Sequence, residues 1–176
     1  DGSTVLTATA QRDPIEGEPS GALVDVHVFR SGEGIGVKTE DPGDPPQIEE
    51  FFGVQEYLFL TFQNPFTLET VEFSNIDITR MTVFRGVAHD GDEFRLLLDG
   101  SLLVEDYLPT NPRAIYDFTS LSPRDRTGTV FMFTTTDDDD QYRIKGLSGT
   151  PVPVPEPATV LLTAIGLVGW AFRKFV

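Results

Sequence analysis

Apolar and polar residues alternate along several short stretches of the chain, which is the period of a β-strand with one buried face. Val24, Val26 and Val28 share one face of the first such stretch. His27, which lies among them, is expected on the exposed face. This first stretch is 22–30. Further strands are expected where runs of apolar and β-branched residues are bounded by Gly, Pro or Asp, at 57–62, 67–73, 76–84, 94–98, 128–135 and 141–147.

Turn signals separate these stretches. Asn64-Pro65 predicts a hairpin between the strands on either side of it, and Asp99-Gly100 predicts a second hairpin with a two-residue turn. No window of ten residues in the body has helical periodicity with caps. Many short strands with closely spaced turns predict an all-β fold, an antiparallel β-sandwich of jelly-roll-like type, for residues 1–147.

The composition changes after residue 147. Residues 148–157 contain four prolines in alternation and predict an extended linker. Fifteen residues without charge follow, and as a helix they span about 23 Å, or about 28 Å when extended to residue 176, against about 30 Å of hydrocarbon. We therefore expect 158–176 to be one transmembrane helix, with Trp170 at the interface and with Arg173 and Lys174 on the cytoplasmic side.

Charge and cysteine content narrow the function classes. The chain has 13 basic and 28 acidic residues and a formal net charge of −15, which repels phosphate backbones and makes nucleic acid a poor partner. Cysteine is absent, so disulfides, thiolate metal sites and cysteine nucleophiles are excluded. Residues 1–10 are small and polar, which we interpret as the start of an exported chain whose signal peptide has been removed.

The tail also has a recognisable order of motifs. The triplet Pro155, Glu156 and Pro157, then an apolar helix, then a basic end, resembles the PEP-CTERM sorting signal of Gram-negative bacteria. In that family the signal is read by exosortase, a membrane transpeptidase-like protease that processes the tail near the triplet and releases or transfers the protein. The residues expected to form the membrane anchor are Leu161, Leu162, Gly166, Gly169, Trp170, Arg173 and Lys174.

Parts of the body carry the resemblance further. The segments 34–37, 56–62, 94–100 and 142–147 are similar to segments of PEP-CTERM ectodomains. Those ectodomains are expected to be jelly-roll-like sandwiches, and most have no assigned activity. The resemblance therefore implies a non-catalytic domain at the bacterial cell envelope, in the periplasm or outside the cell.

Three functions follow from these features. A retained tail makes the protein an inner-membrane subunit that braces the periplasmic face of a larger membrane complex, photosynthetic or respiratory. A processed tail instead releases the domain to the extracellular matrix or polysaccharide. The third is a carbohydrate-active enzyme, which needs two carboxylates at working distance, and no such pair stands out in the sequence.

Candidate binding residues are few. The two acidic runs, 90–93 and 137–140, offer carboxylate oxygens of the kind that bind Ca²⁺. Neither run has the spacing of a calcium loop, so two solvated turns with no cofactor are the simpler interpretation. Phe51 and Phe52 are adjacent, so on a strand they cannot both face one core, and the exposed ring predicts an interface. The weak calcium candidates are Asp90, Asp92, Glu93, Asp137, Asp138, Asp139 and Asp140.

Overall fold

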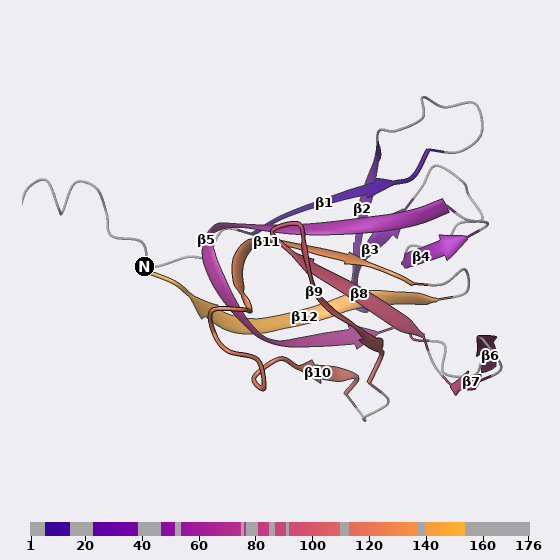
Figure 1. Ribbon diagram of the computed structural model, residues 1–176. Helices are drawn as coiled ribbons and strands as arrows, with labels where there is room; N and C mark the ends of the chain where they lie inside the picture. Colours follow the sequence, from indigo (N-terminus) through magenta and orange to yellow (C-terminus); the bar gives the residue numbers. More distant parts are fainter. Residues whose placement is uncertain are drawn as a thin grey trace, which may run out of the picture.

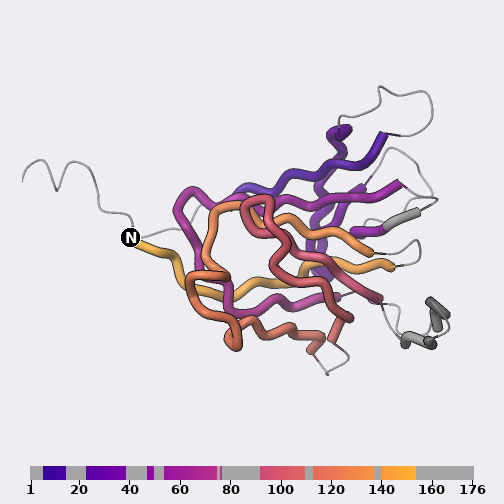
Figure 2. The backbone as a smooth tube through the Cα atoms, in the orientation of Figure 1, coloured from indigo at the N-terminus to yellow at the C-terminus, as the bar shows by residue number. Residues whose placement is uncertain are grey.

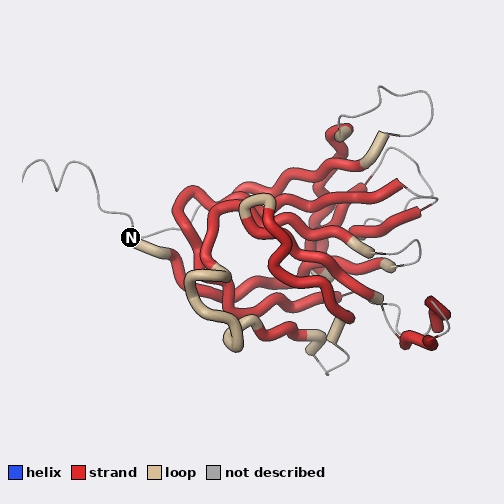
Figure 3. The backbone as a smooth tube through the Cα atoms, in the orientation of Figure 1, coloured by secondary structure: helices blue, strands red, loops and turns tan. Residues whose placement is uncertain are grey.

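The computed structural model of the protein is all-β (Figure 1). It describes residues 6–14, 23–38, 47–51, 54–74, 76, 81–84, 87–90, 92–109, 113–136 and 140–153, with the backbone alone at 50, 51, 81–84 and 87–90. Strands and loops account for all of these residues, and none is helical, as the sequence predicts (Figure 3).

Twelve strands are described, and every pairing between them is antiparallel. In chain order they are β1 (Leu6–Arg12), β2 (Val24–Ser31), β3 (Gly34–Lys38), β4 (Ile48–Phe51), β5 (Val54–Ser74), β6 (Met81–Phe84), β7 (Val87–Asp90), β8 (Glu93–Leu98), β9 (Ser101–Tyr107), β10 (Ile115–Asp117), β11 (Thr127–Thr134) and β12 (Gln141–Pro151).

The long strand β5 corrects one prediction. The hairpin expected at Asn64-Pro65 does not form, because the segments on either side of it belong to one continuous strand of 21 residues. The first half of β5 pairs with β1 and β11, and the second half pairs with β12 and β10. Asn64 keeps a negative φ, so the positive φ that a two-residue hairpin turn needs is not supplied. The chain instead bends into a wide corner, which Figure 2 follows along the backbone.

The corner of β5 joins two layers. One layer contains β1, the first half of β5, β11, β8 and β9, and the other contains β10, the second half of β5, β12, β3 and β2. The β1–β2 pairing links the two layers a second time. Ten of the described strands thus form one sheet folded into two layers, called the sandwich below, which is closed on one side by β1 and β2 and at one end by the corner (Figure 1). Strands β6 and β7 form a separate two-stranded sheet.

The core lies between the layers. Leu58, Leu60 and Phe62 are buried, which confirms the face that the alternation predicts. Contacts across the core include Phe73 on β5 and Phe94 on β8, whose ring centroids lie 4.8 Å apart. The remaining fully buried large side chains are Ile48, Leu68, Leu96, Phe118, Phe131, Phe133, Tyr142 and Ile144.

A β-bulge changes which residues of β5 face the core. Leu68 pairs with Gly149, whereas Thr70 pairs with the preceding Ser148, so Glu69 is the extra residue on β5. The Glu69 carbonyl oxygen accepts a hydrogen bond from the backbone N–H of Phe118, at 2.8 Å. The bulge keeps apolar residues buried on both sides of it although their spacing changes from even to odd.

The Asp99-Gly100 hairpin forms as predicted. Leu98 pairs with Ser101, and the two turn residues have φ of 48° and 81°. These positive values are those of a tight two-residue turn, and they explain why Gly occupies the second position.

The domain extends beyond its predicted boundary. Strand β12 continues past Leu147 and pairs with β5 as far as Pro151, so the first residues of the expected linker 148–157 belong to the sheet. The backbone N–H of Val152 then donates to the Pro65 carbonyl at 2.7 Å. The expected helix 158–176 lies outside the described residues. Within the part of the chain that the structure describes, no helix is long and apolar enough to cross a membrane.

Candidate functional site

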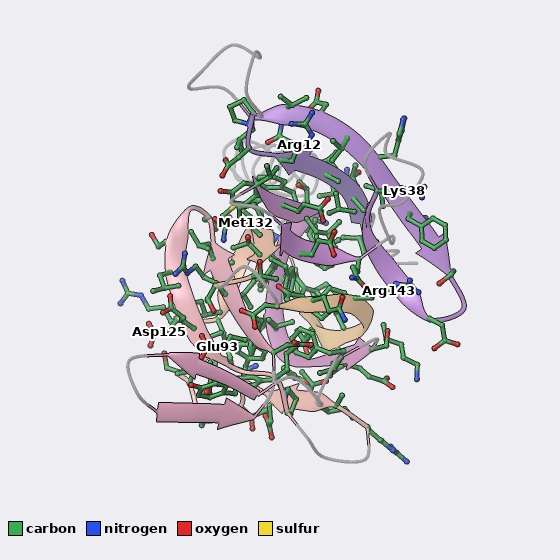
Figure 4. The ribbon with its side chains drawn as sticks, turned by 90° about the vertical axis from the view of Figure 1, so that its right-hand side faces the viewer. Arg12, Lys38, Glu93, Asp125, Met132 and Arg143 are labelled. Atoms are coloured by element: carbon green, nitrogen blue, oxygen red, sulfur yellow. The ribbon has the colours of Figure 1, made fainter. Side chains whose placement is uncertain are left out.

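The sandwich has two ends of different chemistry. The corner end consists of Leu6, residues 62–66, the Asp99–Gly100 turn, Pro151 and Val152, which the pairings of β1, β5, β11 and β12 place together. The acidic end lies at the opposite ends of the long strands and consists of Gln47, Glu56, Asp92, Glu93, Thr136 and Asp140. Figure 4 looks onto the acidic end, with Glu93 labelled.

The acidic end brings together two acidic runs that are far apart in the sequence. Asp140 Oδ1 accepts a hydrogen bond from the Glu93 backbone N–H at 2.9 Å. Asp140 Oδ2 accepts from the Thr136 N–H at 3.3 Å, and the Thr136 hydroxyl lies 2.6 Å from Glu93 Oε2 and 3.1 Å from Asp140 Oδ2. These bonds join the start of β8 to the turn that precedes β12. Asp140 is only 6% exposed, so its charged hydrogen bonds are shielded from water.

A second group of buried polar residues lies beside this one. The Thr134 hydroxyl donates to the Glu56 carbonyl at 2.8 Å, and the Tyr142 hydroxyl donates to the Thr134 carbonyl at 2.7 Å. Burial raises the pKa of Tyr142 well above its usual value, and the nearby charge of Asp140 raises it further. Tyr142 therefore stays protonated and acts as a hydrogen-bond donor in the core.

Two glutamines and two glutamates complete the acidic end. Gln47 is 2% exposed, and its amide nitrogen donates to Glu49 Oε2 at 2.9 Å and also to the side chain of Gln141. The Glu56 side chain accepts from the Glu49 backbone N–H at 3.2 Å. These bonds join β4, β5 and β12, so the polar side chains hold strand ends together.

The calcium candidates are only partly brought together. Asp92 is 3% exposed, and its carbonyl oxygen accepts from the Leu108 N–H at 2.7 Å. For Asp90 the structure gives only its place in β7, and 137–139 lie outside the described residues. In the described ranges no three acidic or histidine side chains are grouped closely enough to hold a metal ion. Calcium binding stays a prediction.

The predicted aromatic interface lies outside the side chains that the structure describes. Phe51 lies in β4, where its backbone pairs with Val54, but its side chain is not described. Phe52 lies outside the described residues. Its role at an interface stays a prediction.

The corner end is held by close packing. The rings of Phe62 and Phe66 are stacked with centroids 4.4 Å apart, and Phe131 meets both rings edge-on at 5.5 and 6.3 Å. A Cβ atom on Gly149 would overlap the Thr67 carbonyl oxygen and the Phe66 ring. The last strand can therefore approach β5 this closely only because it carries glycine at that position.

The connections at the two ends differ in charge. At the acidic end, 13–23 and 39–47 each contain three acids and 135–140 contain four, all without a base; 75–92 contain three acids and two bases, and 108–114 contain one base and no acid. At the corner end, 63–65 contain no charge, 99–100 contain one acid, and 118–126 contain two bases and one acid. Arg12, Lys38 and Arg143, labelled in Figure 4, add positive charge near the acidic end but do not balance it.

The residues that follow the corner end give the decisive comparison. A family model of the PEP-CTERM protein-sorting motif matches residues 153–174. The chain carries a PEP-CTERM sorting motif. The motif starts at Pro153, directly after Val152, whose backbone N–H is hydrogen-bonded to the sandwich. A PEP-CTERM motif implies a protein that exosortase processes and that is secreted or kept in the cell envelope, outside the cytoplasm. No curated protein and no solved structure matches the chain.

Sequence reasoning named Asp92, Glu93 and Asp140 only as calcium candidates and missed the other residues of the acidic end. Glu56 did carry a signal, because it lies at even spacing from Leu58 and Leu60 and so shares their buried face. The pairing of Glu93 with Asp140 had no such signal, because it depends on β8 and β12 ending at the same end of the sandwich.

Proposed function

We propose that the protein is a non-catalytic β-sandwich with a structural or binding role at the bacterial cell envelope, where exosortase processing delivers it to the extracellular matrix or polysaccharide. The observation that carries this proposal is the position of the PEP-CTERM motif, which begins where the last strand of the sandwich ends. The folded domain is thereby the part that remains after processing near the triplet.

Before processing, the apolar run after the triplet anchors the protein. Fifteen uncharged residues followed by Arg173 and Lys174 hold the chain in the inner membrane with the domain outside. Cleavage near Pro155, Glu156 and Pro157 separates the domain from this run. A permanent anchor in a larger membrane complex, which is the first alternative from the sequence, has no observation in its favour and stays a prediction.

The acidic end supports a non-catalytic role. Both carboxylate oxygens of Asp140 accept hydrogen bonds from backbone N–H groups, and Glu93 is bonded through Thr136. A general acid or base needs a carboxyl group that can reach a substrate, whereas these groups connect strand ends. Hydrolysis of a polysaccharide by the unaltered chain, with loss of that activity in a Glu93→Gln variant, would instead support the hypothesis of a carbohydrate-active enzyme.

The experiment replaces the triplet in the bacterium that makes the protein. We expect a chain with Pro155→Ala, Glu156→Ala and Pro157→Ala to stay at full mass in the membrane fraction, while the unaltered chain loses its tail and leaves that fraction. Pro153→Ala is the matched control, because it removes a proline of the same segment outside the triplet. Equal processing of the triple variant and the control would contradict the proposal.

A further inference from the structure

We infer that, before processing, the corner end is the surface that faces the lipid leaflet, with the acidic end directed away from the membrane. This inference rests on the proposed function, because it needs the tail to be held in the bilayer. It adds an orientation and a contacting surface, and it follows from the tether, the charge distribution and the packing of β12.

The tether is too short to let the domain turn over. Among the residues that the structure describes, Val152 is the last one bonded to the sandwich, and the apolar run begins at residue 158. Five residues separate them, and the six Cα–Cα steps from 152 to 158 span about 20 Å in an extended or polyproline conformation. The sandwich is longer than this, because β12 from Gln141 to Pro151 extends for about 30 Å. The end from which the tether leaves must therefore stay near the membrane.

The tether also leaves from a firmly held point. Thr150 and Pro151 pair with Thr67 and Phe66, and Val152 donates to Pro65. Gly149 packs against β5 at a distance that admits no side chain. The sandwich therefore holds the chain as far as Val152, so the short tether brings the corner of β5 to the membrane surface.

Charge favours the same orientation. The three acid-only connections leave the acidic end, about 30 Å from the corner end along the strands. The Debye length is about 8 Å at physiological ionic strength, so charge at the acidic end is screened from an anionic leaflet beside the corner end. Acids pressed against such a leaflet would be repelled, whereas the connections of the corner end carry little net charge.

Exposed leucines do not decide the orientation but provide a matched pair of probes. Leu102, 58% exposed, lies beside the Asp99–Gly100 turn at the corner end. Leu23, 41% exposed, lies next to Val24 at the acidic end, where Val24 pairs with Arg12. Neither side chain belongs to the buried core, so each can be replaced without disturbing it.

The test uses the full chain, which contains no cysteine, so each probe is a single cysteine. Leu102→Cys and Leu23→Cys carry the same fluorophore, and the chains are placed in vesicles of zwitterionic and anionic lipid with spin-labelled headgroups as quenchers. We expect a marked loss of fluorescence at residue 102 and little at residue 23. Equal quenching at the two positions, or stronger quenching at 23, would overturn the inference.

Two further results separate the inference from the function on which it rests. A chain that does not bind the vesicles, shown by flotation, would contradict the membrane-held tail and so the proposed function itself. A flexible insert of about 20 Gly and Ser residues after Pro153 gives an average reach of about 25 Å, and we expect it to remove the difference between the two probes. Persistence of the full difference would show that the short tether does not set the orientation.

Discussion

The two ends of the sandwich are stabilised in different ways. At the corner end, aromatic rings and glycine contacts leave no room for added atoms, as Phe62, Phe66 and Gly149 show. At the acidic end, buried polar groups such as Asp140 and Thr134 bond to the backbone of neighbouring strands. Packing fixes the end that carries the sorting motif, and hydrogen bonds fix the end that carries most of the acidic connections.

This difference matches what each end must do. The corner end is followed directly by the PEP-CTERM motif, so a rigid attachment fixes the point at which the motif leaves the domain. The acidic end bears the long connections, and surface connections are where proteins tolerate change and bind partners. A binding role at the envelope is therefore expected at the acidic end, away from the membrane.

The largest expected effect concerns packing at the corner end. Phe131→Ala removes a fully buried ring that contacts Phe62 and Phe66, and we expect it to lower the free energy of unfolding by about 3–5 kcal/mol. Urea unfolding measures this. Met132→Ala is the control on the opposite face of the same strand and should cost clearly less. Equal costs would mean that the corner end is not close-packed.

The next effect concerns hydrogen bonding at the acidic end. Asp140→Ala leaves the N–H groups of Glu93 and Thr136 without their acceptor, and we expect a loss of about 2 kcal/mol. Asp25→Ala, at an exposed residue that accepts one hydrogen bond from Gln11, should change the stability by less than about 0.5 kcal/mol. If both variants unfold at the same urea concentration, the buried bonds of Asp140 do not stabilise this end.

A smaller effect concerns the attachment of the motif. A methyl group on Gly149 would overlap β5, and we expect Gly149→Ala to cost about 1–2 kcal/mol and to loosen the end of β12. Gly146→Ala is the matched control, because its new Cβ would lie 3.8 Å from the nearest atom, Glu72 Oε2. Hydrogen exchange at Val152 should speed up in the first variant and not in the second. Unchanged exchange in both would contradict the tight attachment.

The smallest effect concerns the edge where the two layers meet. The Tyr116 hydroxyl on β10 donates to Asp106 Oδ2 on β9 at 2.7 Å. Burial, together with the hydrogen bond and charge of Asp106, raises the pKa of Tyr116 to about 12. The folded state thus holds this proton more tightly than the unfolded state, so the stabilisation is complete below pH 10 and is lost as the pH rises from 10 to about 12.

Tyr116→Phe tests this linkage. Because the site is largely open to water, we expect the variant to be less stable than the unaltered chain by no more than about 1 kcal/mol at pH 8. The difference between the two chains should shrink towards pH 12. A difference that stays constant from pH 8 to pH 12 would show that the Tyr116 proton is not coupled to folding.

Local pattern predicted the strands but not how they are joined. The alternation around Leu58 and Leu60 gave the correct buried face, and Asp99-Gly100 gave the correct turn because these residues adopt the φ that the turn needs. Asn64-Pro65 was wrong as a hairpin, because the partners of β5 come from strands that are distant in sequence. Such pairings depend on the whole topology, which no short window contains.

The tail and the acidic end likewise show that a short stretch of sequence predicts contiguous features but not contacts between distant strands. The sorting motif was predicted from the order of its parts, because triplet, apolar run and basic end are contiguous. The boundary at Leu147 was placed too early, since Gly149 and Pro151 look like linker residues but lie beside β5. The contact between Glu93 and Asp140 joins residues from two different strands and was likewise not visible in the sequence.

The most direct test of the account is the intact mass of the protein from the envelope and medium of the bacterium that makes it. We predict a chain that ends near Pro155–Pro157, lacks the apolar run and is found outside the inner membrane. A chain that retains residues 158–176 and stays in the inner membrane with stoichiometric partner subunits would contradict exosortase processing and would support a permanently anchored subunit instead.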